Sequence, residues 1–159
     1  MRAWLTAFAL GMCLVACSDS PSGPYEGQSA PSFQGPLMRG GTAQLDGFEG
    51  KPTMLVFWAS WCGPCRKEAP QIASVAAQYG TAVNVVGVNA GESVAVAQRA
   101  AQGMGIQWPV FMDLKGQIQT LYKVNGIPLV LILDAEGVVR HRNNGVPSNV
   151  HRLLDGLMP

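Results

Sequence analysis

Two closely spaced cysteines offer the chemistry of reactive sulfur. Cys62 and Cys65 are separated by Gly63 and Pro64 in the segment FWASWCGPCRKEAP, residues 57–70. A pair of this kind can contribute to a zinc site, close a structural disulfide, or exchange electrons as a dithiol and a disulfide. The rest of the sequence bears on which of these applies.

A zinc site and a purely structural disulfide are both disfavoured. A structural zinc site needs four ligands, and the only histidines, His141 and His151, are distant in sequence and lack the usual spacing. A disulfide between Cys62 and Cys65 would close so short a loop that it would remove little entropy from the unfolded chain. The sequence therefore predicts no metal at this pair and favours redox exchange.

The flanking segments place the two cysteines where a strand meets a helix. TMLVFW, residues 53–58, is an apolar run typical of a strand buried on both faces, and helical periodicity covers residues 64–79, with a kink expected at Pro70. Backbone N–H groups and the helix dipole at such a junction stabilise a thiolate. We therefore expect Cys62 to be an exposed nucleophile with a lowered pKa, and Cys65 to be shielded and to resolve the mixed disulfide.

This cysteine segment resembles the active site of the thioredoxin superfamily, in particular the TlpA/ResA-like extracytoplasmic thiol-disulfide oxidoreductases. The resemblance extends over residues 31–159 and includes VNAGES, WPVFMD and GIPLVLILDAEG. It implies an α/β thioredoxin-like fold, with a central mixed β-sheet flanked by helices, an N-terminal β-hairpin and a strand–helix insertion. It also implies an enzyme without a cofactor, in which Cys62 attacks the substrate and Cys65 resolves the mixed disulfide.

The resemblance also implies substrate contacts around the cysteines. It implies that Pro128 is cis and lies beside the pair, and that the backbone of Ile127 pairs with the bound substrate. Trp61, Gly63 and Pro64 complete the expected substrate-binding residues. From the residues alone, Pro128 could equally be a trans proline that ends the loop, because most X–Pro bonds are trans.

Two positions, Val56 and Leu129, depart from the patterns of the family, and Glu92 matches one of them. Thioredoxin has a buried Asp where this chain has Val56, and the ResA-like proteins have a Glu at the position of Glu92. Glu92 is therefore the expected acid–base group for Cys65, although a Glu in the first turn of a helix is favoured by the dipole whatever its chemistry. Leu129 replaces the usual Thr after the proline, and we expect it to alter substrate preference.

Residues 1–16 are typical of a signal peptide. Arg2 is followed by an apolar run without charge that is too short to span a bilayer. The run ends in LVAC, which resembles the lipobox of bacterial lipoproteins, and this implies that Cys17 becomes a lipid-bearing N-terminus. The alternatives are an ordinary signal peptide with an incidental cysteine, or a weak membrane anchor.

A short tether is expected between the lipid and the folded part. Residues 17–30 are rich in Ser, Pro and Gly and predict a flexible tether, followed by a folded domain over residues 31–159. This arrangement predicts a lipid-anchored protein on the periplasmic or extracytoplasmic face of the bacterial envelope. Ser18 rather than Asp follows Cys17, so the sequence does not select the inner or the outer membrane.

The remaining patterns predict one domain with alternating strands and helices. The chain of 159 residues has a formal net charge of +1, which indicates no nucleic-acid partner. The expected elements are a hairpin within residues 31–52, strands within 82–90, 108–113 and 128–142, and helices at 92–105, 115–124 and 148–157.

The predicted function is disulfide reduction on envelope proteins, with apocytochrome c as one candidate substrate. The resemblance implies a membrane thiol donor of the CcdA or DsbD type that recharges the cysteine pair. One alternative is a Cu(I)-binding thiol chaperone, since thiolates are soft ligands. Another is a dithiol oxidase or isomerase, although these usually have His in the dipeptide between the cysteines.

Overall fold

Buried apolar runs form the mixed five-stranded sheet at the centre of the molecule. The computed structural model describes residues 21–159. The strands are β3 (Thr53–Trp58), β4 (Asn84–Ala90), β5 (Val110–Asp113), β6 (Leu129–Leu133) and β7 (Val139–Asn143). Their order is β5-β4-β3-β6-β7, with β3, β4 and β5 parallel to one another and β6 antiparallel to both of its neighbours. This is the mixed sheet that the resemblance implied.

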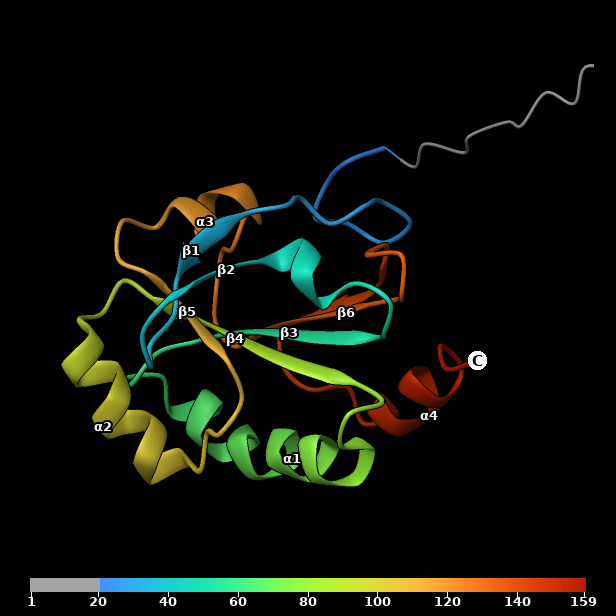
Figure 1. The fold of residues 1–159 in the computed structure, drawn as a ribbon. Coiled ribbons are helices and arrows are strands. Elements are labelled where there is room, and N and C mark those ends of the chain that lie inside the picture. Colours follow the sequence, from blue (N-terminus) through green and yellow to red (C-terminus); the bar gives the residue numbers. More distant parts are fainter. Residues whose placement is uncertain (1–20) are drawn as a thin grey trace, which may run out of the picture.

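Helices cover both faces of this sheet (Figure 1). On one face lie α1 (Gly63–Tyr79), α2 (Val94–Met104) and α4 (Val150–Asp155). On the other face lie α3 (Gln117–Leu121), the short 3-10 helix η1 (Leu45–Phe48) and the expected hairpin of β1 (Gln34–Pro36) and β2 (Thr42–Gln44). The thioredoxin-like fold is therefore confirmed.

Alternation along β3 explains why this strand reads as a continuous apolar run. Met54 and Val56 face the core beneath α1, whereas Leu55 and Phe57 face the core beneath α3 and the hairpin. Successive side chains of a strand point to opposite faces, so a strand with helices on both sides needs apolar residues at every position.

The helices are close to their predicted ranges, and local capping explains the differences. In α2 the Ser93 hydroxyl accepts a hydrogen bond from Val96 N, and Gly105 ends the helix with a φ of 68°. The third helix is shorter than expected, because Gly116, with a φ of 68°, precedes it and Asp113 caps its first turn. The closing helix is also shorter than predicted and ends at Asp155.

The folded part begins earlier than the sequence predicted. Backbone hydrogen bonds join Gly27 N to Val139 O (2.8 Å) and Ala30 N to Gly137 O (2.9 Å), and Val139 N donates to Gln28 O (2.9 Å). The expectation that the flexible tether extends to residue 30 was therefore wrong for this stretch. The reason is that β7 lies at the edge of the sheet, where its backbone groups still need partners.

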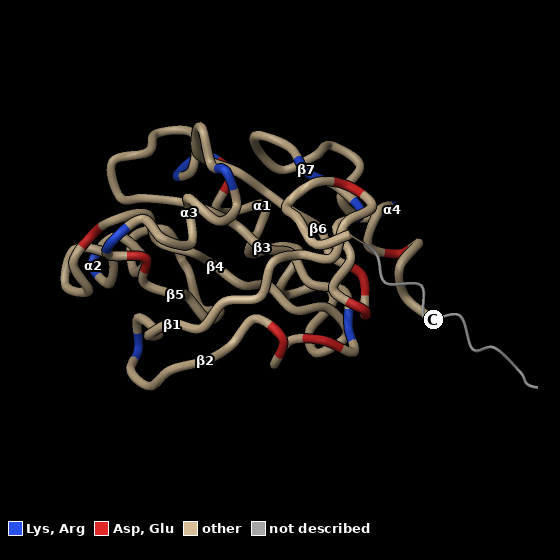
Figure 2. Tube along the Cα trace, turned by 90° about the horizontal axis from the view of Figure 1, so that it is seen from above, with Lys and Arg blue, Asp and Glu red and all other residues tan. Residues whose placement is uncertain are grey.

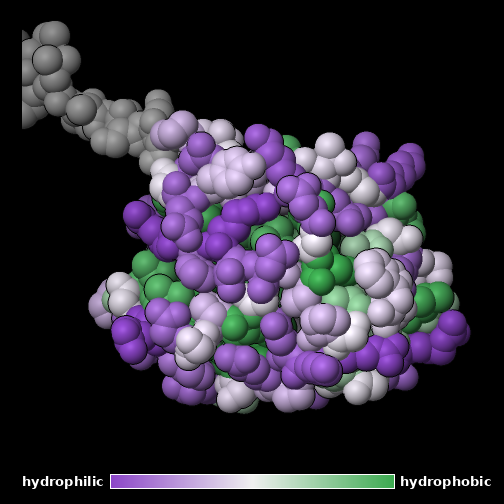
Figure 3. Space-filling view, turned by 180° about the vertical axis from the view of Figure 1, so that it is seen from behind, coloured by the Kyte–Doolittle hydropathy of each residue, from purple (hydrophilic) through white to green (hydrophobic). Residues whose placement is uncertain are grey.

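The surface carries charges of both signs. Figure 2 shows Lys and Arg interspersed with Asp and Glu along the trace, and the face in Figure 3 is mostly hydrophilic with small separate hydrophobic areas. Among residues 21–159, no helix has both the length and the apolar composition that crossing a bilayer requires. The expected signal peptide and the lipidation site Cys17 lie outside the described residues.

Candidate active site

The two cysteines form a disulfide at the junction of β3 and α1. Cys62 and Cys65 have a Cα–Cα distance of 5.3 Å, and Cys62 is the N-cap residue of α1. Pro64 lies in the first turn, where its missing N–H costs nothing because that group would have no partner in the helix. The strand thus delivers the pair to the helix N-terminus, as the sequence predicted.

Cys62 is not exposed in this oxidised form. Both cysteines are 3% exposed, so the expectation of an exposed Cys62 was wrong for the disulfide state. The cause is that Cys62 Sγ turns back onto the helix and accepts a hydrogen bond from Cys65 N at 3.2 Å. The neighbouring Trp61 is 70% exposed and presents a large apolar surface beside the pair, whereas Trp58 is part of the core.

The loop before β6 lies against the same helix. The Ile127–Pro128 peptide is cis, as the resemblance implied, and Pro128 is buried. Pro128 and Cys65 line a small cavity of about 10 Å³ together with Val56. The expected effect of Leu129 on substrate preference receives no support from its position: Leu129 pairs with Phe57 and is buried in the core on the opposite face of the sheet.

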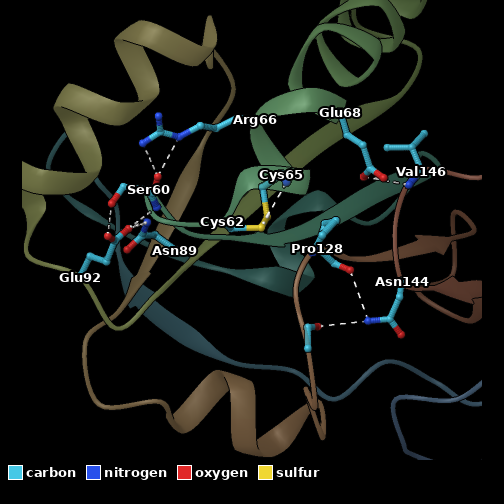
Figure 4. The surroundings of a disulfide bond; sticks show 11 residues. Ser60, Cys62, Cys65, Arg66, Glu68, Asn89, Glu92, Pro128, Asn144 and Val146 are labelled. Atoms are coloured by element: carbon cyan, nitrogen blue, oxygen red, sulfur yellow. Dashed lines mark hydrogen bonds between the residues drawn. A yellow bond between two sulfur atoms is a disulfide. The ribbon is translucent and has the colours of Figure 1, made fainter.

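Glu92 lies on one side of the disulfide and binds the segment that precedes it (Figure 4). Its carboxylate accepts hydrogen bonds from Ser60 N (2.8 Å) and from the Ser60 hydroxyl. A third hydrogen bond comes from Asn89 Nδ2 at 2.8 Å. Arg66 in turn donates from Nε to Ser60 O at 2.9 Å. Glu92 therefore joins the end of β4 to the loop that leads into the cysteines.

These contacts set the pKa of Glu92. Burial raises it, but the hydrogen bonds from Ser60 and Asn89 and the charge of Arg66 outweigh burial and lower the pKa below its ordinary value of 4.5. An acid–base group for a thiol works best with a pKa near 7. The acid–base role predicted for Glu92 thus receives no support from its surroundings, which favour a carboxylate that holds the loop.

Glu68 lies on the other side of the disulfide, and sequence reasoning missed it. It is half-buried, lines the cavity with Cys65, and accepts a hydrogen bond from Val146 N at 3.1 Å. Asn144, also missed, donates from Nδ2 to Gly126 O (3.3 Å) and Pro128 O (3.4 Å). The one signal in the sequence is that a charged residue three positions after Cys65 must share its face of the helix.

The remaining polar residues provide no metal site in the part of the chain that the structure describes. Among residues 21–159, no three His, Cys, Asp or Glu side chains are grouped so that they could hold an ion. The two histidines have different neighbours. His141 Nδ1 lies 3.6 Å from Glu26 Oε1, and His151 Nδ1 lies 3.4 Å from the Tyr79 hydroxyl oxygen. Dithiol–disulfide exchange is the chemistry that this arrangement supports.

Comparisons with known proteins agree with this chemistry. The AhpC/TSA family model matches residues 27–142. The chain is 36% identical over 126 residues to thioredoxin-like protein YneN of Bacillus subtilis, covering 77% of this chain and 74% of that protein. It is 28% identical to thiol-disulfide oxidoreductase ResA of Geobacillus kaustophilus, covering 84% and 78%. A crystal structure of a thiol:disulfide interchange protein from Chlorobium tepidum aligns with a TM-score of 0.72 at 27% identity, covering 82% of this chain and 96% of that one.

Proposed function

We propose that this chain, which belongs to the AhpC/TSA family and is a thiol-disulfide oxidoreductase, works as a membrane-tethered disulfide reductase outside the cytoplasm. The observation that carries the proposal is the Cys62–Cys65 disulfide at the start of α1, beside the exposed Trp61. The Gly63–Pro64 dipeptide between the cysteines is the thioredoxin-like choice and supports the reducing direction.

The proposed reaction is two successive thiol–disulfide exchanges. In the reduced enzyme the Cys62 thiolate attacks one sulfur of the substrate disulfide, forms a mixed disulfide and releases the other substrate sulfur as a thiolate. The Cys65 thiolate then attacks Cys62 Sγ, which closes the Cys62–Cys65 disulfide and releases the second substrate sulfur. The substrate gains two electrons and two protons, and the enzyme loses them.

The substrates that we propose are envelope proteins with disulfides, apocytochrome c among the candidates. Disulfides persist outside the cytoplasm, so a dedicated reductant has substrates there. Each turnover leaves the pair oxidised, and the proposed source of new electrons is a membrane thiol donor of the CcdA or DsbD type. A lipid on Cys17 that is retained in the inner membrane would keep the enzyme and this donor near the same surface.

The reduction potential of the Cys62–Cys65 pair tests the direction of the reaction. The full chain, kept in detergent, is equilibrated in thiol–disulfide buffers, and its redox state is read from tryptophan fluorescence. We expect a potential of about −270 mV or lower, the thioredoxin range. A potential of about −120 mV, that of a strong oxidant, would overturn the reductase proposal and leave exchange itself intact.

A labelling experiment tests the tether separately. Cells that express the full chain are grown with radioactive palmitate, and the label on the protein is compared with that on the Cys17→Ser variant. We expect label on the wild type alone. Equal labelling of the two proteins, or none on either, would contradict lipidation at Cys17. The redox state of the pair in cells with and without a CcdA-type protein then tests the donor.

A further inference from the structure

A groove opens between α1 and α2 beside the segment that leads into the cysteines. The two helices lie side by side on one face of the sheet (Figure 1). The groove between them has a volume of about 460 Å³, and Ser60, two residues before Cys62, forms part of its wall. Since a water molecule in the liquid takes up about 30 Å³, this groove has room for side chains of a bound polypeptide.

Two arginines line the groove, one from each helix. Arg66 on α1 donates from Nε and Nη2 to Ser60 O and is thereby held against the loop (Figure 4). A guanidinium has five N–H donors, so further donors of Arg66 remain for a ligand. Arg99 on α2 is exposed. Within residues 21–159, no carboxylate oxygen lies within 4.0 Å of either guanidinium, so both lack an ion-pair partner.

Glu92 supplies only part of the missing negative charge. The charge of Arg66 contributes to the lowered pKa of Glu92, so the two groups influence each other. The Glu92 carboxylate is nevertheless occupied by its hydrogen bonds from Ser60 and Asn89. One carboxylate against two guanidinium groups leaves a positive charge at the groove that the described part of the chain does not neutralise.

The α2 side of the groove combines this charge with an apolar wall. Val96, Arg99 and Gly103 follow one another at intervals of three and four residues, which places them on one face of the helix. Val96, Ala100 and Met104 are half-buried and line the groove. A Cβ at Gly103 would meet nothing within 4 Å, so the groove is open at this position. Such a surface suits a side chain with an aliphatic stem and a terminal carboxylate.

We propose that the groove between α1 and α2 is a specificity subsite in which Arg66 and Arg99 bind an acidic side chain of the polypeptide whose disulfide reacts at Cys62. The inference rests on the proposed function, since it takes disulfide-containing polypeptides as the substrates. Residues of an extended chain are about 3.3 Å apart, so the neighbours of the reacting cysteine pass next to the groove. Opposite charges across such a contact favour one substrate over another.

Three disulfides test the subsite. Two are synthetic peptides with one intramolecular disulfide, identical except that the residues flanking the cysteines are Glu in one and Gln in the other. The third is hydroxyethyl disulfide, a small neutral molecule that reports on exchange at sulfur alone. The reduced full-length protein, kept in detergent, is mixed with each disulfide, and its oxidation is followed by tryptophan fluorescence. Each peptide's rate is divided by its rate with dithiothreitol, which removes differences in intrinsic reactivity.

Three variants separate the groove from the overall charge. Arg99→Glu reverses a charge inside the groove. Lys67→Glu makes the same change at an exposed residue of α1 that is not part of the groove wall. Gly103→Leu fills the groove without a change of charge, and leucine is a better helix former than glycine. Arg99 and Gly103 are both exposed, so we expect all three variants to fold.

We expect wild type to react about fivefold faster with the Glu peptide than with the Gln peptide, as for a partly exposed ion pair. Salt should weaken this preference because it screens exposed charges. Arg99→Glu should invert the preference, since like charges would then meet, and Gly103→Leu should abolish it. Lys67→Glu should keep the preference within about twofold of wild type. The rate with hydroxyethyl disulfide should change by less than about twofold in all three variants.

Equal rates with the two peptides in wild type would overturn the inference. A preference lost as fully in Lys67→Glu as in Arg99→Glu would also overturn it, because the overall charge would then explain the selectivity. So would a preference that survives in Gly103→Leu, since the groove would not be its source. A wild-type enzyme that reacted with none of the three disulfides would instead contradict the proposed function, so the two failures can be told apart.

Discussion

The two glutamates that flank the disulfide, Glu92 and Glu68, hold different parts of the molecule. Glu92 accepts hydrogen bonds from Ser60 and Asn89 and thereby fastens the segment that enters the cysteines. Glu68 accepts from Val146 and fastens the loop that supports Pro128. Each of these carboxylates therefore has a backbone N–H donor from a segment that it holds in place, Ser60 N for Glu92 and Val146 N for Glu68.

The largest expected effect comes from replacing either cysteine of the disulfide that lies between the two glutamates. Cys62→Ser should abolish exchange with insulin, a polypeptide disulfide, and with a small disulfide, because Cys62 is the N-cap residue of α1 and the proposed nucleophile, whereas Cys65 is the proposed resolving cysteine. Cys65→Ser should still attack but should accumulate a mixed disulfide, since the resolving thiol is gone. Mass spectrometry of the trapped adduct checks this order, and an adduct formed by Cys65 in Cys62→Ser would reverse the two roles.

Two glycines give a matched test of how tightly each side is built. Gly145 contacts Glu68, whereas Gly91 precedes Glu92, has a φ of 76° and has nothing near its missing Cβ. Gly91→Ala should cost about 1–2 kcal/mol of stability for the backbone alone. Gly145→Ala should cost about 2–4 kcal/mol, because it also displaces the charged acceptor of Val146. Urea unfolding measures both.

The two glycine substitutions can also be compared in a protein that lacks the Glu68 carboxylate. In a Glu68→Ala background, Gly145→Ala should cost no more stability than Gly91→Ala, because the Cβ added at position 145 would no longer meet the Glu68 carboxylate. If Gly145→Ala still cost more stability than Gly91→Ala in this background, the loop after β7 would be strained for reasons unrelated to Glu68. The difference between the two glycines could then not be assigned to the neighbouring glutamate.

The pH dependence of stability distinguishes the Glu92 side. The pKa of Glu92 is lowered in the folded state, so the ionised form stabilises the fold, fully above about pH 4.5 and progressively less as pH falls through the folded pKa. Glu92→Gln should therefore be less stable than wild type at pH 7 by about 1–2 kcal/mol, and the difference should shrink below about pH 4.5. Unfolding at a series of pH values measures this.

The same variant decides the acid–base role. We expect the pH profile of exchange for Glu92→Gln to match that of wild type between about pH 6 and 8, where a useful acid–base group would titrate. A profile that shifted in this range, with the fold intact, would restore the acid–base role that the sequence predicted for Glu92.

The smallest expected effect is at Ser60. Ser60→Ala removes the hydroxyl donor to Glu92 and leaves the backbone N–H in place. We expect a loss of stability of about 1 kcal/mol or less and a rise of the Glu92 pKa toward its ordinary value. An NMR titration of the Glu92 carboxyl carbon checks the direction. A pKa that fell further would mean that the hydroxyl does not donate to this carboxylate.

The sequence predicted the sheet, the helices and the cysteine junction because these follow from short-range patterns. The apolar run of β3, the caps of α2 and the CGPC segment each lie within a few residues of one another. The contacts of Glu68 with Val146 and of Asn144 with Pro128 could not be found in this way. They join residues 78 and 16 positions apart, and only the folded sheet brings these together.

The burial of Leu129 and of Cys62 could also not be predicted from the sequence. Leu129 follows the proline directly, but the alternation of β6 turns its side chain to the far face of the sheet. Cys62 was expected to be exposed because a nucleophile must reach its substrate, yet in the closed disulfide its sulfur lies against the first turn of α1. In both cases the direction of a side chain, rather than its type, decided the outcome.

The docking of residues 22–30 along β7 has a consequence for how the enzyme meets its partners. Gly27 and Ala30 fasten this stretch to the sheet, and Arg142 donates to Pro24 O at 3.1 Å. With a lipid on Cys17, the connection to the docked stretch would be the four residues 18–21, which reach at most about 14 Å at full extension. The domain would then be confined close to the bilayer surface, and its electron donor and its substrates would have to approach that surface.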